Sequence, residues 1–399
     1  MEGFFYFYHM SKTNFILFDG ADRVNFLPLT YTRPMAELRI GIMTIREKWE
    51  THLGSSTSTL TEQYLQFKYP LTLTEKNTWI NAQCLPDSNL VNAILSLNSN
   101  QTLHWNGVVV AYNSSDHTVP KESIEFNSEV VFLSQVFDLF RLNHDALQFD
   151  FELITAGRKS EELPEHVRTT CPENIFLEPG ARIGHAVLNA STGPIYLGKN
   201  TEVMDGCLVR GGLSLGEGSV LKMGAKIYGP TTIGPHCKVG GEVNNAVFMG
   251  YSNKGHDGFL GNSVIGEWCN LGADTNTSNL KNNYEEVRLW NYKSLNFAKT
   301  GLQFCGLIMG DHSKCGINTM FNTGTVVGVS SNIFGSGFPR NFVPSFSWGG
   351  HSGFQVYNFA KAIAVARAVM IRRSMELSEL DENILQNVFD QTATFRSSF

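Results

Sequence analysis

One histidine lies in a glycine-rich segment where it could act as a proton acceptor. His256 follows Gly255 and precedes Asp257 and Gly258. A neutral imidazole can take a proton from an amine near pH 7, which few other side chains can do. The segment therefore predicts a general base at His256, with a surface histidine of no function as the alternative.

Apolar residues recur at every sixth position through much of the second half of the chain. The repeat consists of Val203, Val209, Leu215, Leu221, Ile227, Ile233 and Val239, and it resumes with Met309, Cys315, Phe321, Val327 and Ile333. This period is neither the 3.6 of a helix nor the alternation of a strand. It is typical of a hexapeptide β-helix, in which each strand contributes one inward residue. A glycine-rich β-sandwich is the alternative.

The repeat is interrupted twice, and both interruptions hold candidate residues. After Val239 the next clear core position is Met249, and a second gap covers residues 272–308. A coil that leaves its register is expected to extrude a loop, and loops on rigid scaffolds often carry binding groups. The first break extends to Ile265, the core position after Met249, and contains His256, and Asn279 lies in the second.

The first part of the chain has the pattern of an α/β domain. Residues 11–165 include apolar segments at 14–18, 107–112 and 130–132, and a helical period over 35–51. These features predict a compact domain in which short strands alternate with helices.

The solenoid is predicted over residues 171–345, and a helical segment over 356–395 follows it. Two amphipathic patterns, at 356–374 and 376–389, predict two helices. Both are expected to pack on the end of the solenoid or on a neighbouring subunit, because the last coil would otherwise leave an unpaired edge.

Composition excludes some classes of function. The 399 residues carry a formal charge of −6, which provides no basic field for nucleic acid. The seven cysteines are scattered without a CxxC motif, as expected of buried thiols in a reducing compartment. No apolar run reaches the length of a membrane span, and no signal peptide is recognisable. A cytoplasmic location is therefore expected.

Two groups of motifs resemble known sugar-nucleotide enzymes. Residues 236–279, which contain KGH, LG, IG and LGA, resemble the acetyltransferase domain of the bifunctional UDP-N-acetylglucosamine pyrophosphorylase/glucosamine-1-phosphate N-acetyltransferase family. Residues 26–35 (FLPLTYTRPM), 38–41 (LRIG) and 47–50 (EKWE) are similar to a Bacteroidetes-type sugar nucleotidyltransferase fused to a hexapeptide-repeat solenoid. The resemblance implies an α/β nucleotidyltransferase-like domain followed by a left-handed parallel β-helix and C-terminal helices.

In the solenoid half, the resemblance implies acetyl transfer. His256 matches the catalytic histidine, which would accept a proton from the 2-amino group of glucosamine-1-phosphate as that nitrogen attacks the thioester of acetyl-CoA. Asn279 matches an asparagine of the substrate loop. Lys226 is the nearest match to the cation that binds the sugar phosphate, and Lys254 and Arg210 are further candidates.

The resemblance also implies a second ligand contact and an assembly. Arg340, just after the last coil, could meet the phosphates of coenzyme A. The family works as a trimer with acetyl-transfer sites between solenoids, so a homotrimer is expected. For Arg340, as for the other cations, an ordinary solvated charge is the alternative, and for Asn279 it is a turn.

In the α/β half, the resemblance implies uridylyl transfer from UTP to N-acetylglucosamine-1-phosphate. Residues 18–23 (FDGADR) stand where this class cradles a triphosphate. Arg23, Arg33 and Lys48 are the predicted nucleotide-binding cations, and Asp19 is the predicted ligand of Mg²⁺. The alternative is that the domain has become structural.

Three hypotheses follow. The first is a bifunctional transferase acting on a sugar phosphate, acetyl-CoA and a nucleoside triphosphate. The second keeps nucleotidyl transfer but changes the sugar, for example to hexose-1-phosphate with dTTP, and uses the solenoid mainly for trimer assembly. The third is a trimeric scaffold or nucleotide-sugar sensor without catalysis.

Overall fold

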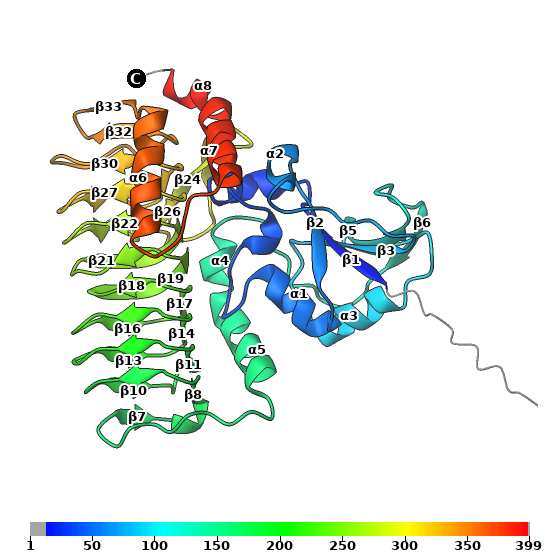
Figure 1. Ribbon diagram of the computed structural model, residues 1–399, viewed down its shortest axis with the longest axis horizontal. Coiled ribbons are helices and arrows are strands. Elements are labelled where there is room, and N and C mark those ends of the chain that lie inside the picture. Colours follow the sequence, from blue (N-terminus) through cyan, green and yellow to red (C-terminus); the bar gives the residue numbers. More distant parts are fainter. Residues whose placement is uncertain (1–12, 398–399) are drawn as a thin grey trace, which may run out of the picture. The chain divides into compact units, whose positions relative to one another are not determined.

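The computed structural model describes residues 13–397, which pack as two units (Figure 1). The first unit contains the residues up to Gly20 together with Arg46–Phe132. The second contains Ala21–Ile45 and everything from Leu133 onward. The division therefore does not follow the boundary predicted at residue 165.

The first unit is built on a six-stranded mixed sheet in the order β2-β1-β3-β5-β4-β6. Its strands are β1 (Asn14–Phe18), β2 (Thr57–Leu60), β3 (Asn77–Asn81), β4 (Gln101–Trp105), β5 (Val108–Ser114) and β6 (Glu122–Glu125), and its helices are α1 (Ile45–Leu53), α2 (Gln63–Gln66) and α3 (Ser88–Leu95). β1 lies parallel to both β2 and β3. Ile16, Trp79 and Tyr112 form a buried cluster on the sheet. The predicted α/β class is confirmed.

Two predicted elements of the first part differ from the structure. The helix expected over 35–51 is a 3-10 turn at Met35–Glu37, followed by α1 only from Ile45. The strand expected at 130–132 is reduced to a single bridge between Cys84 and Phe132. Gly41 explains the first difference, because its positive φ of 70° cannot continue a helix.

The second unit contains a parallel β-helix with three faces, which confirms the predicted solenoid. Face A contains β8 (Ile175–Leu177), β11 (Ile195–Leu197), β14 (Leu213–Leu215), β17 (Thr231–Ile233), β26 (Leu307–Met309), β29 (Thr325–Val327) and β31 (Phe342–Val343). Face B contains β9 (Arg182–Ile183), β12 (Glu202–Val203), β15 (Val220–Leu221), β18 (Lys238–Val239), β20 (Asn253–Lys254), β22 (Asn270–Leu271), β27 (Lys314–Cys315), β30 (Asn332–Ile333) and the hairpin β32 (Ser347–Gly350) and β33 (Gly353–Val356).

Face C completes each coil. It contains β7 (Arg168–Thr170), β10 (Val187–Asn189), β13 (Leu208–Arg210), β16 (Lys226–Tyr228), β23 (Asn276–Thr277) and β28 (Met320–Phe321). The long strands β19 (Glu242–Gly250) and β21 (Phe259–Glu267) run from face C around a corner onto face A. All residues of the period-six repeat are buried in the continuous core of this solenoid.

The two breaks in the repeat have different structural causes. At the first, Leu221 and its register partner Val239 are 18 residues apart, whereas Val239 and its next partner Lys254 are only 15 apart. The coil is shorter there because β19 turns its corner without a loop. The expected extruded loop at His256 is therefore wrong, and the residue lies at a plain corner after β20. At the second break the chain does leave the coil, and it forms the antiparallel hairpin β24 (Arg288–Asn291) and β25 (Asn296–Lys299).

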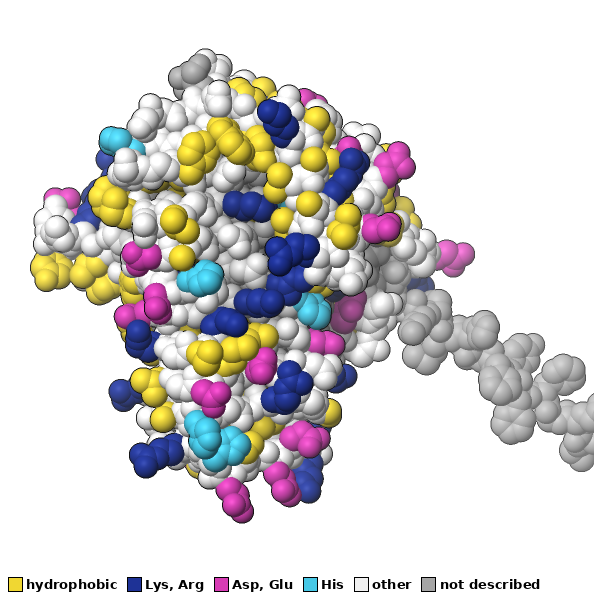
Figure 2. All heavy atoms as spheres, turned by 60° about the vertical axis from the view of Figure 1, so that its left-hand side comes forward, with side chains coloured by type: hydrophobic (Ala, Val, Ile, Leu, Met, Phe, Trp, Pro, Cys, Tyr) yellow, Lys and Arg dark blue, Asp and Glu magenta, His cyan; other side chains and the backbone are white. Residues whose placement is uncertain are grey.

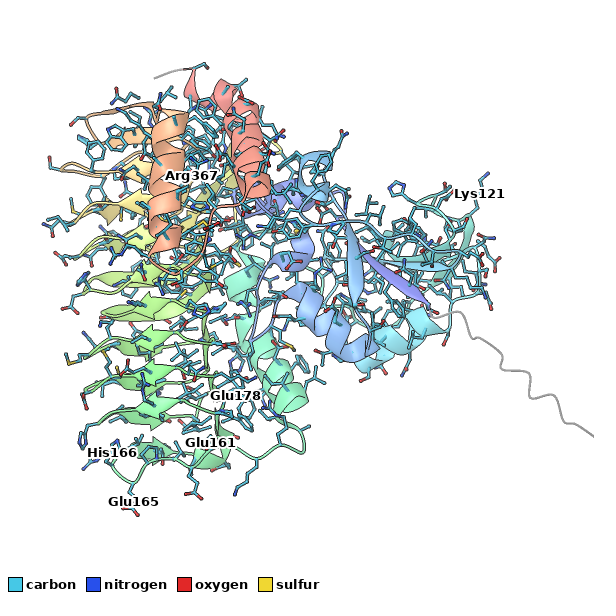
Figure 3. The ribbon with its side chains drawn as sticks, in the orientation of Figure 1. Lys121, Glu161, Glu165, His166, Glu178 and Arg367 are labelled. Atoms are coloured by element: carbon cyan, nitrogen blue, oxygen red, sulfur yellow. The ribbon has the colours of Figure 1, made fainter. Side chains whose placement is uncertain are left out.

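The segment Ala21–Ile45 packs against the solenoid together with the helices α4 (Asp138–Arg141) and α5 (Asn143–Thr155). The Asp150 carboxylate accepts hydrogen bonds from the backbone N–H groups of Ile42 and Met43, at 2.7 and 3.1 Å. The Thr232 hydroxyl on face A donates to the Gly41 carbonyl at 2.7 Å. After α5, Arg158 makes two 2.7 Å hydrogen bonds to Glu178, which fastens the chain to the first coil (Figure 3).

The C-terminal helices are α6 (Phe359–Ile371), α7 (Glu379–Gln391) and α8 (Ala393–Arg396), which confirms both predicted helices. Arg367 of α6 forms an ion pair with Glu382 of α7 (Figure 3). A capping box of Ser378 and Asp381 starts α7. None of the helices within residues 13–397 combines the length and the apolarity that a bilayer crossing requires.

Candidate active site on solenoid face B

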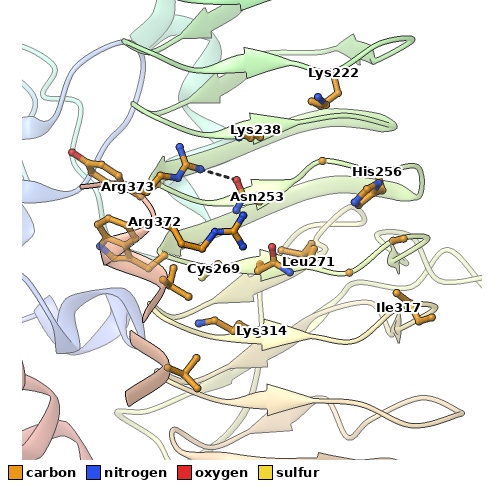
Figure 4. Close-up of a pocket in the computed structure, with 18 residues that line it drawn as sticks. Lys222, Lys238, Asn253, His256, Cys269, Leu271, Lys314, Ile317, Arg372 and Arg373 are labelled. Carbon is orange, nitrogen blue, oxygen red and sulfur yellow. Dashed lines mark hydrogen bonds between the residues drawn. The ribbon is translucent and has the colours of Figure 1, made fainter. Parts of the chain in front are cut away.

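A cavity of about 760 Å³ lies between face B and helix α6 (Figure 4). It is lined by strand residues of face B, by the corner that carries His256, and by the end of α6. Its polar and cationic lining includes Lys222, Lys238, Asn253, His256, Asn270, Lys314, Arg372 and Arg373, and Tyr251 and Trp268 line it at the corner between faces A and B. We refer to this cavity as the face B groove.

The floor of the groove is a ladder of polar side chains. Lys238, Asn253, Asn270 and Lys314 are consecutive register partners on β18, β20, β22 and β27. Each precedes a residue whose side chain enters the core, and successive side chains of a strand point to opposite faces. The alternation therefore aims all four outward. The Lys314 ammonium donates to the His312 carbonyl at 2.8 Å, and burial lowers the pKa of Lys314.

The C-terminal end of α6 supplies two further cations. Arg372 and Arg373 line the groove, and the Arg373 guanidinium donates to the amide oxygen of Asn253 at 3.0 Å (Figure 4). With Lys222, Lys238 and Lys314, five cationic side chains surround the cavity.

No Asp or Glu belongs to the described lining of the groove. Lys and Arg side chains form a band over this region of the surface (Figure 2). Clustered cations in a cleft raise the local concentration of anions. The face B groove is therefore suited to a ligand that carries phosphate.

Two stacked aromatic rings, Tyr251 and Trp268, line one wall of the groove, and His236 and His312 extend the stack on either side. Tyr251 and Trp268 are parallel at 4.3 Å between centroids, His236 lies 5.1 Å from Tyr251, and His312 lies 6.4 Å from Trp268. All four occupy equivalent corners and have positive φ. Desolvation lowers the pKa of His312 to about 3, so this imidazole stays neutral at neutral pH.

His256 lies exposed at the opposite corner, between faces B and C. Beneath it, Lys254 occupies a core position, because its register partner is the inward Val239. The Lys254 ammonium donates to the carbonyls of His256 and Gly240 at 2.9 and 3.0 Å. Burial lowers the pKa of Lys254 to about 8, against the opposing effect of Asp257. This lysine supports the backbone of the corner, and its side chain does not line the groove.

The predicted phosphate ligands Lys226 and Arg210 are exposed on face C. Lys226 is a register partner of Glu242, whose carboxylate accepts a 2.5 Å hydrogen bond from the Tyr228 hydroxyl. Phe259 is the next residue of this ladder and follows the His256 corner. His256 can thus be reached from both faces B and C.

Neither Asn279 nor Arg340 lines the face B groove beside His256 of the same chain. The Asn279 side chain donates to Asn262 at 2.8 Å, near the corner between faces C and A. Arg340 lies over the Phe354 ring, 5.7 Å from its centroid, and lines a different cavity. Their predicted roles in binding remain predictions.

The predicted nucleotide-binding cations are engaged within the protein. Arg33 is buried and forms ion pairs with Asp311 and, at 3.0 Å, with Glu267. The Arg23 guanidinium donates to the Thr30 carbonyl. Lys48 on α1 is buried as well. A role in binding nucleotide stays a prediction for these residues, and the contacts of Arg33 alone account for its burial.

Asp19 directly follows β1, and its carboxylate accepts a 2.5 Å hydrogen bond from the hydroxyl of Thr61, which directly follows β2. Ligands of α/β sheets bind at the carboxyl ends of parallel strands, and Asn81 and Gln83 lie at that end of β3. No group of three or more His, Cys, Asp or Glu suited to a metal occurs among residues 13–397. Since Mg²⁺ often needs only one or two carboxylates beside substrate phosphates, Asp19 fits a Mg²⁺ that arrives with a nucleotide.

The main cations of the groove are not among the site residues predicted from the sequence. Lys238 and Lys314 immediately precede the period-six residues Val239 and Cys315, so their outward orientation could have been derived from the repeat. Arg372 and Arg373 could not have been placed, because no period relates α6 to a face of the solenoid.

Comparisons with known proteins give matches to parts of the chain. Residues 15–159 match the family model "Sugar nucleotidyl transferase". The Bifunctional protein GlmU of Methanocaldococcus jannaschii is 37% identical over 87 residues, which are 22% of this chain and 21% of that protein. The Bifunctional sugar-1-phosphate nucleotidylyltransferase/acetyltransferase of Sulfurisphaera tokodaii is 33% identical over 93 residues, 23% of each chain. The chain thus spans less than a quarter of the length of these two relatives.

Among solved structures, the polySia specific acetyltransferase NeuO aligns over 49% of this chain and 88% of its own, with 13% identity and a TM-score of 0.27. The assignment of the solenoid therefore depends on the strand pairing of this chain itself. The family model and the Sulfurisphaera tokodaii relative are named as transferases, the class of enzyme that the sequence predicts for this protein.

Proposed function

We propose that the protein is a bifunctional-type sugar-phosphate transferase, in which the solenoid transfers an acetyl group and the α/β domain a nucleotidyl group. The observation that carries the first half is the face B groove, where five cations and no lining carboxylate lead to an exposed imidazole. Acetyl-CoA and an amino-sugar 1-phosphate are both anionic, and such a groove would concentrate them.

In the acetyl-transfer step, the 2-amino nitrogen of glucosamine-1-phosphate attacks the thioester carbonyl. A C–N bond forms, and the proton leaves the nitrogen for the His256 imidazole. The C–S bond then breaks, and the CoA thiolate takes up the proton. An N–H group close to the carbonyl oxygen would stabilise the oxyanion. No covalent acyl-enzyme is required, which is consistent with cysteines whose thiols are held neutral by burial.

A homotrimer would complete the acetyl-transfer site. The edge between faces B and C carries two exposed apolar side chains, Met223 and Ile317, at 71% and 70% exposure. A second copy packed along this edge would bury them beside His256. It could also bring in Asn279 or Lys226, which lie away from the face B groove of their own chain.

The second half of the proposal is uridylyl transfer from UTP to N-acetylglucosamine-1-phosphate. The match of residues 15–159 to a sugar nucleotidyl transferase family supports it. Mg²⁺, when bound, would neutralise charge on the phosphate oxygens, and Asp19 would hold it. The polar residues at the carboxyl ends of β1 and β3 would then face the nucleotide.

The test is a pair of assays on the full chain. Incubation with acetyl-CoA and a panel of amino-sugar phosphates should release free thiol, and incubation with UTP, Mg²⁺ and sugar 1-phosphates should release pyrophosphate. Thiol release without any pyrophosphate would leave the α/β domain structural.

Pyrophosphate without thiol would favour the alternative of a nucleotidyltransferase for another sugar, for example a hexose-1-phosphate with dTTP. Absence of both products, with no rise in melting temperature on adding acetyl-CoA or UTP, would favour the non-catalytic scaffold.

A further inference from the structure

A second cationic cavity lies outside the proposed acetyl-transfer site. It has a volume of about 610 Å³, within the usual range for a small-molecule site. Its lining consists of Lys281, Arg288, Trp290, Phe297, Thr323, Arg340, Asn341 and Phe342. It shares no residue with the lining of the face B groove.

Three cations from separate segments converge on this cavity. Lys281 precedes the hairpin, Arg288 begins β24, and Arg340 follows the coil that contains β30. The Lys281 ammonium donates to the Glu286 carbonyl at 2.9 Å, and the Arg288 guanidinium donates to the Phe297 carbonyl at 2.8 Å. These bonds orient the two side chains without neutralising their charge.

The described lining of this cavity contains no carboxylate. The nearby Glu286 carboxylate pairs with Lys299 instead, at 3.7 Å. Like charges that converge repel one another, and an anion bound among them relieves that repulsion. The lining of the cavity is therefore suited to a negatively charged ligand.

Aromatic rings form the rest of the wall. Trp290 stacks on Phe342 with centroids 4.2 Å apart and planes within 9°, and Phe297 meets Trp290 edge-on at 5.5 Å. The Trp290 indole N–H is buried and has no acceptor within the described chain. Phe297 itself is half-buried, so part of its ring remains available to a flat ligand.

From this combination we infer that the hairpin cavity binds a nucleoside phosphate, with the phosphates on Lys281, Arg288 and Arg340 and the base against the aromatic wall. Phosphate prefers charge-assisted hydrogen bonds, and bases stack on aromatic side chains. The same chemistry occurs in a free nucleoside triphosphate and in the nucleotide end of coenzyme A. The inference requires neither half of the proposed function.

The experiment is isothermal titration of the full chain with ATP, UTP, coenzyme A, pyrophosphate and adenosine in separate arms. Arg288→Gln and Lys281→Gln should each weaken nucleotide binding about tenfold, because each removes a charged hydrogen-bond donor. Lys293→Gln is the matched control on the same hairpin, because Lys293 does not line the cavity and pairs with Asp22, and its affinity should equal that of the wild type. Trp290→Phe keeps a ring but removes the N–H, and a smaller loss is expected.

Several results would overturn the inference. One is binding that is unchanged in both Arg288→Gln and Lys281→Gln. Another is binding that Arg372→Gln removes while Arg288→Gln leaves it intact, which would assign the nucleotide to the face B groove. Pyrophosphate binding as tight as ATP would show that the base makes no contact. A preference for coenzyme A over ATP and UTP would identify the source of the nucleotide while supporting the site.

Discussion

Two arginine sites in the solenoid unit use the same side chain in opposite ways. Arg33 is buried between the carboxylates of Asp311 and Glu267. Arg373, at the end of α6, reaches only the neutral amide oxygen of Asn253 among its described hydrogen bonds. The first cation is neutralised by the protein, whereas the second retains its charge for the face B groove.

The difference shows how a structural cation can be separated from a ligand-binding one. A buried charge is tolerated only when it is paired, so the partners of Arg33 are a condition of folding. A cation that lines an open groove needs no carboxylate partner to be stable, because water solvates its charge until an anionic ligand binds. Removing a carboxylate partner of Arg33 therefore tests the structural site, and removing a cation of the face B groove tests the binding site.

The largest expected effect is on catalysis. Replacing His256 by Asn should lower the rate of acetyl transfer by about 10²- to 10⁴-fold, since a positioned base contributes this much. The control is His185→Asn, an exposed histidine on the same edge of the solenoid. Thiol release at saturating acetyl-CoA is the measurement, and equal rates in both variants would remove His256 from the mechanism.

The next effect is on stability at the neutralised site. Asp311→Asn removes the buried partner of Arg33 and should lower the free energy of unfolding by about 3–5 kcal/mol. Glu267→Gln breaks the other pair of the same arginine, but this carboxylate is 32% exposed, so its loss should cost no more than about 1 kcal/mol. Urea unfolding measures both, and equal losses would contradict the distinction.

The solenoid could be predicted closely from its repeat, because one inward residue per strand leaves a periodic record in the sequence. The break after Val239 could not be interpreted in the same way. The coil is shortened there, and a lysine, Lys254, occupies the position of an aliphatic residue. Polarity suggested a ligand contact for Lys254, whereas the register places it in the core.

The candidate site was only partly predictable for a related reason. The motif around His256 predicts a base there, but the loop expected at this residue is a plain corner, because Lys254 stands where an aliphatic residue would have marked the register. The outward lysines follow from the repeat. Arg372 reaches the groove only because α6 packs beside face B, which is a tertiary arrangement without a local signal. Arg33 illustrates the converse, because its acidic partners lie more than 230 residues away in the chain.

Lys254 offers a pH test of its buried position. Its pKa in the folded protein is about 8, below the ordinary 10.5, so between these values the unfolded chain holds a proton that the folded chain has lost. Stability contributed by this group should therefore rise with pH through that window, and the full cost of the buried charge applies below pH 8. Between pH 7.5 and about 10, the free energy of unfolding of the wild type should therefore rise by about 1–3 kcal/mol relative to that of Lys254→Met.

Urea unfolding at several pH values gives this difference. Lys199→Met is the control, because Lys199 is exposed and does not act on the pKa of Lys254, so its removal should leave the pH profile unchanged. A constant difference between the wild type and Lys254→Met would show that the ammonium is not desolvated in the folded state.

The smallest effect concerns single cations of the face B groove. Lys238→Gln should weaken binding of acetyl-CoA by up to about tenfold and reduce its dependence on salt, because one of several charged contacts is lost. Lys199→Gln removes an exposed lysine of the same solenoid outside the groove lining, and it should change neither quantity. Titration at two salt concentrations separates the variants. Equal effects would mean that the net charge of the solenoid, and not the groove, attracts the ligand. The groove cations would then have no specific role in binding that distinguishes them from Arg33.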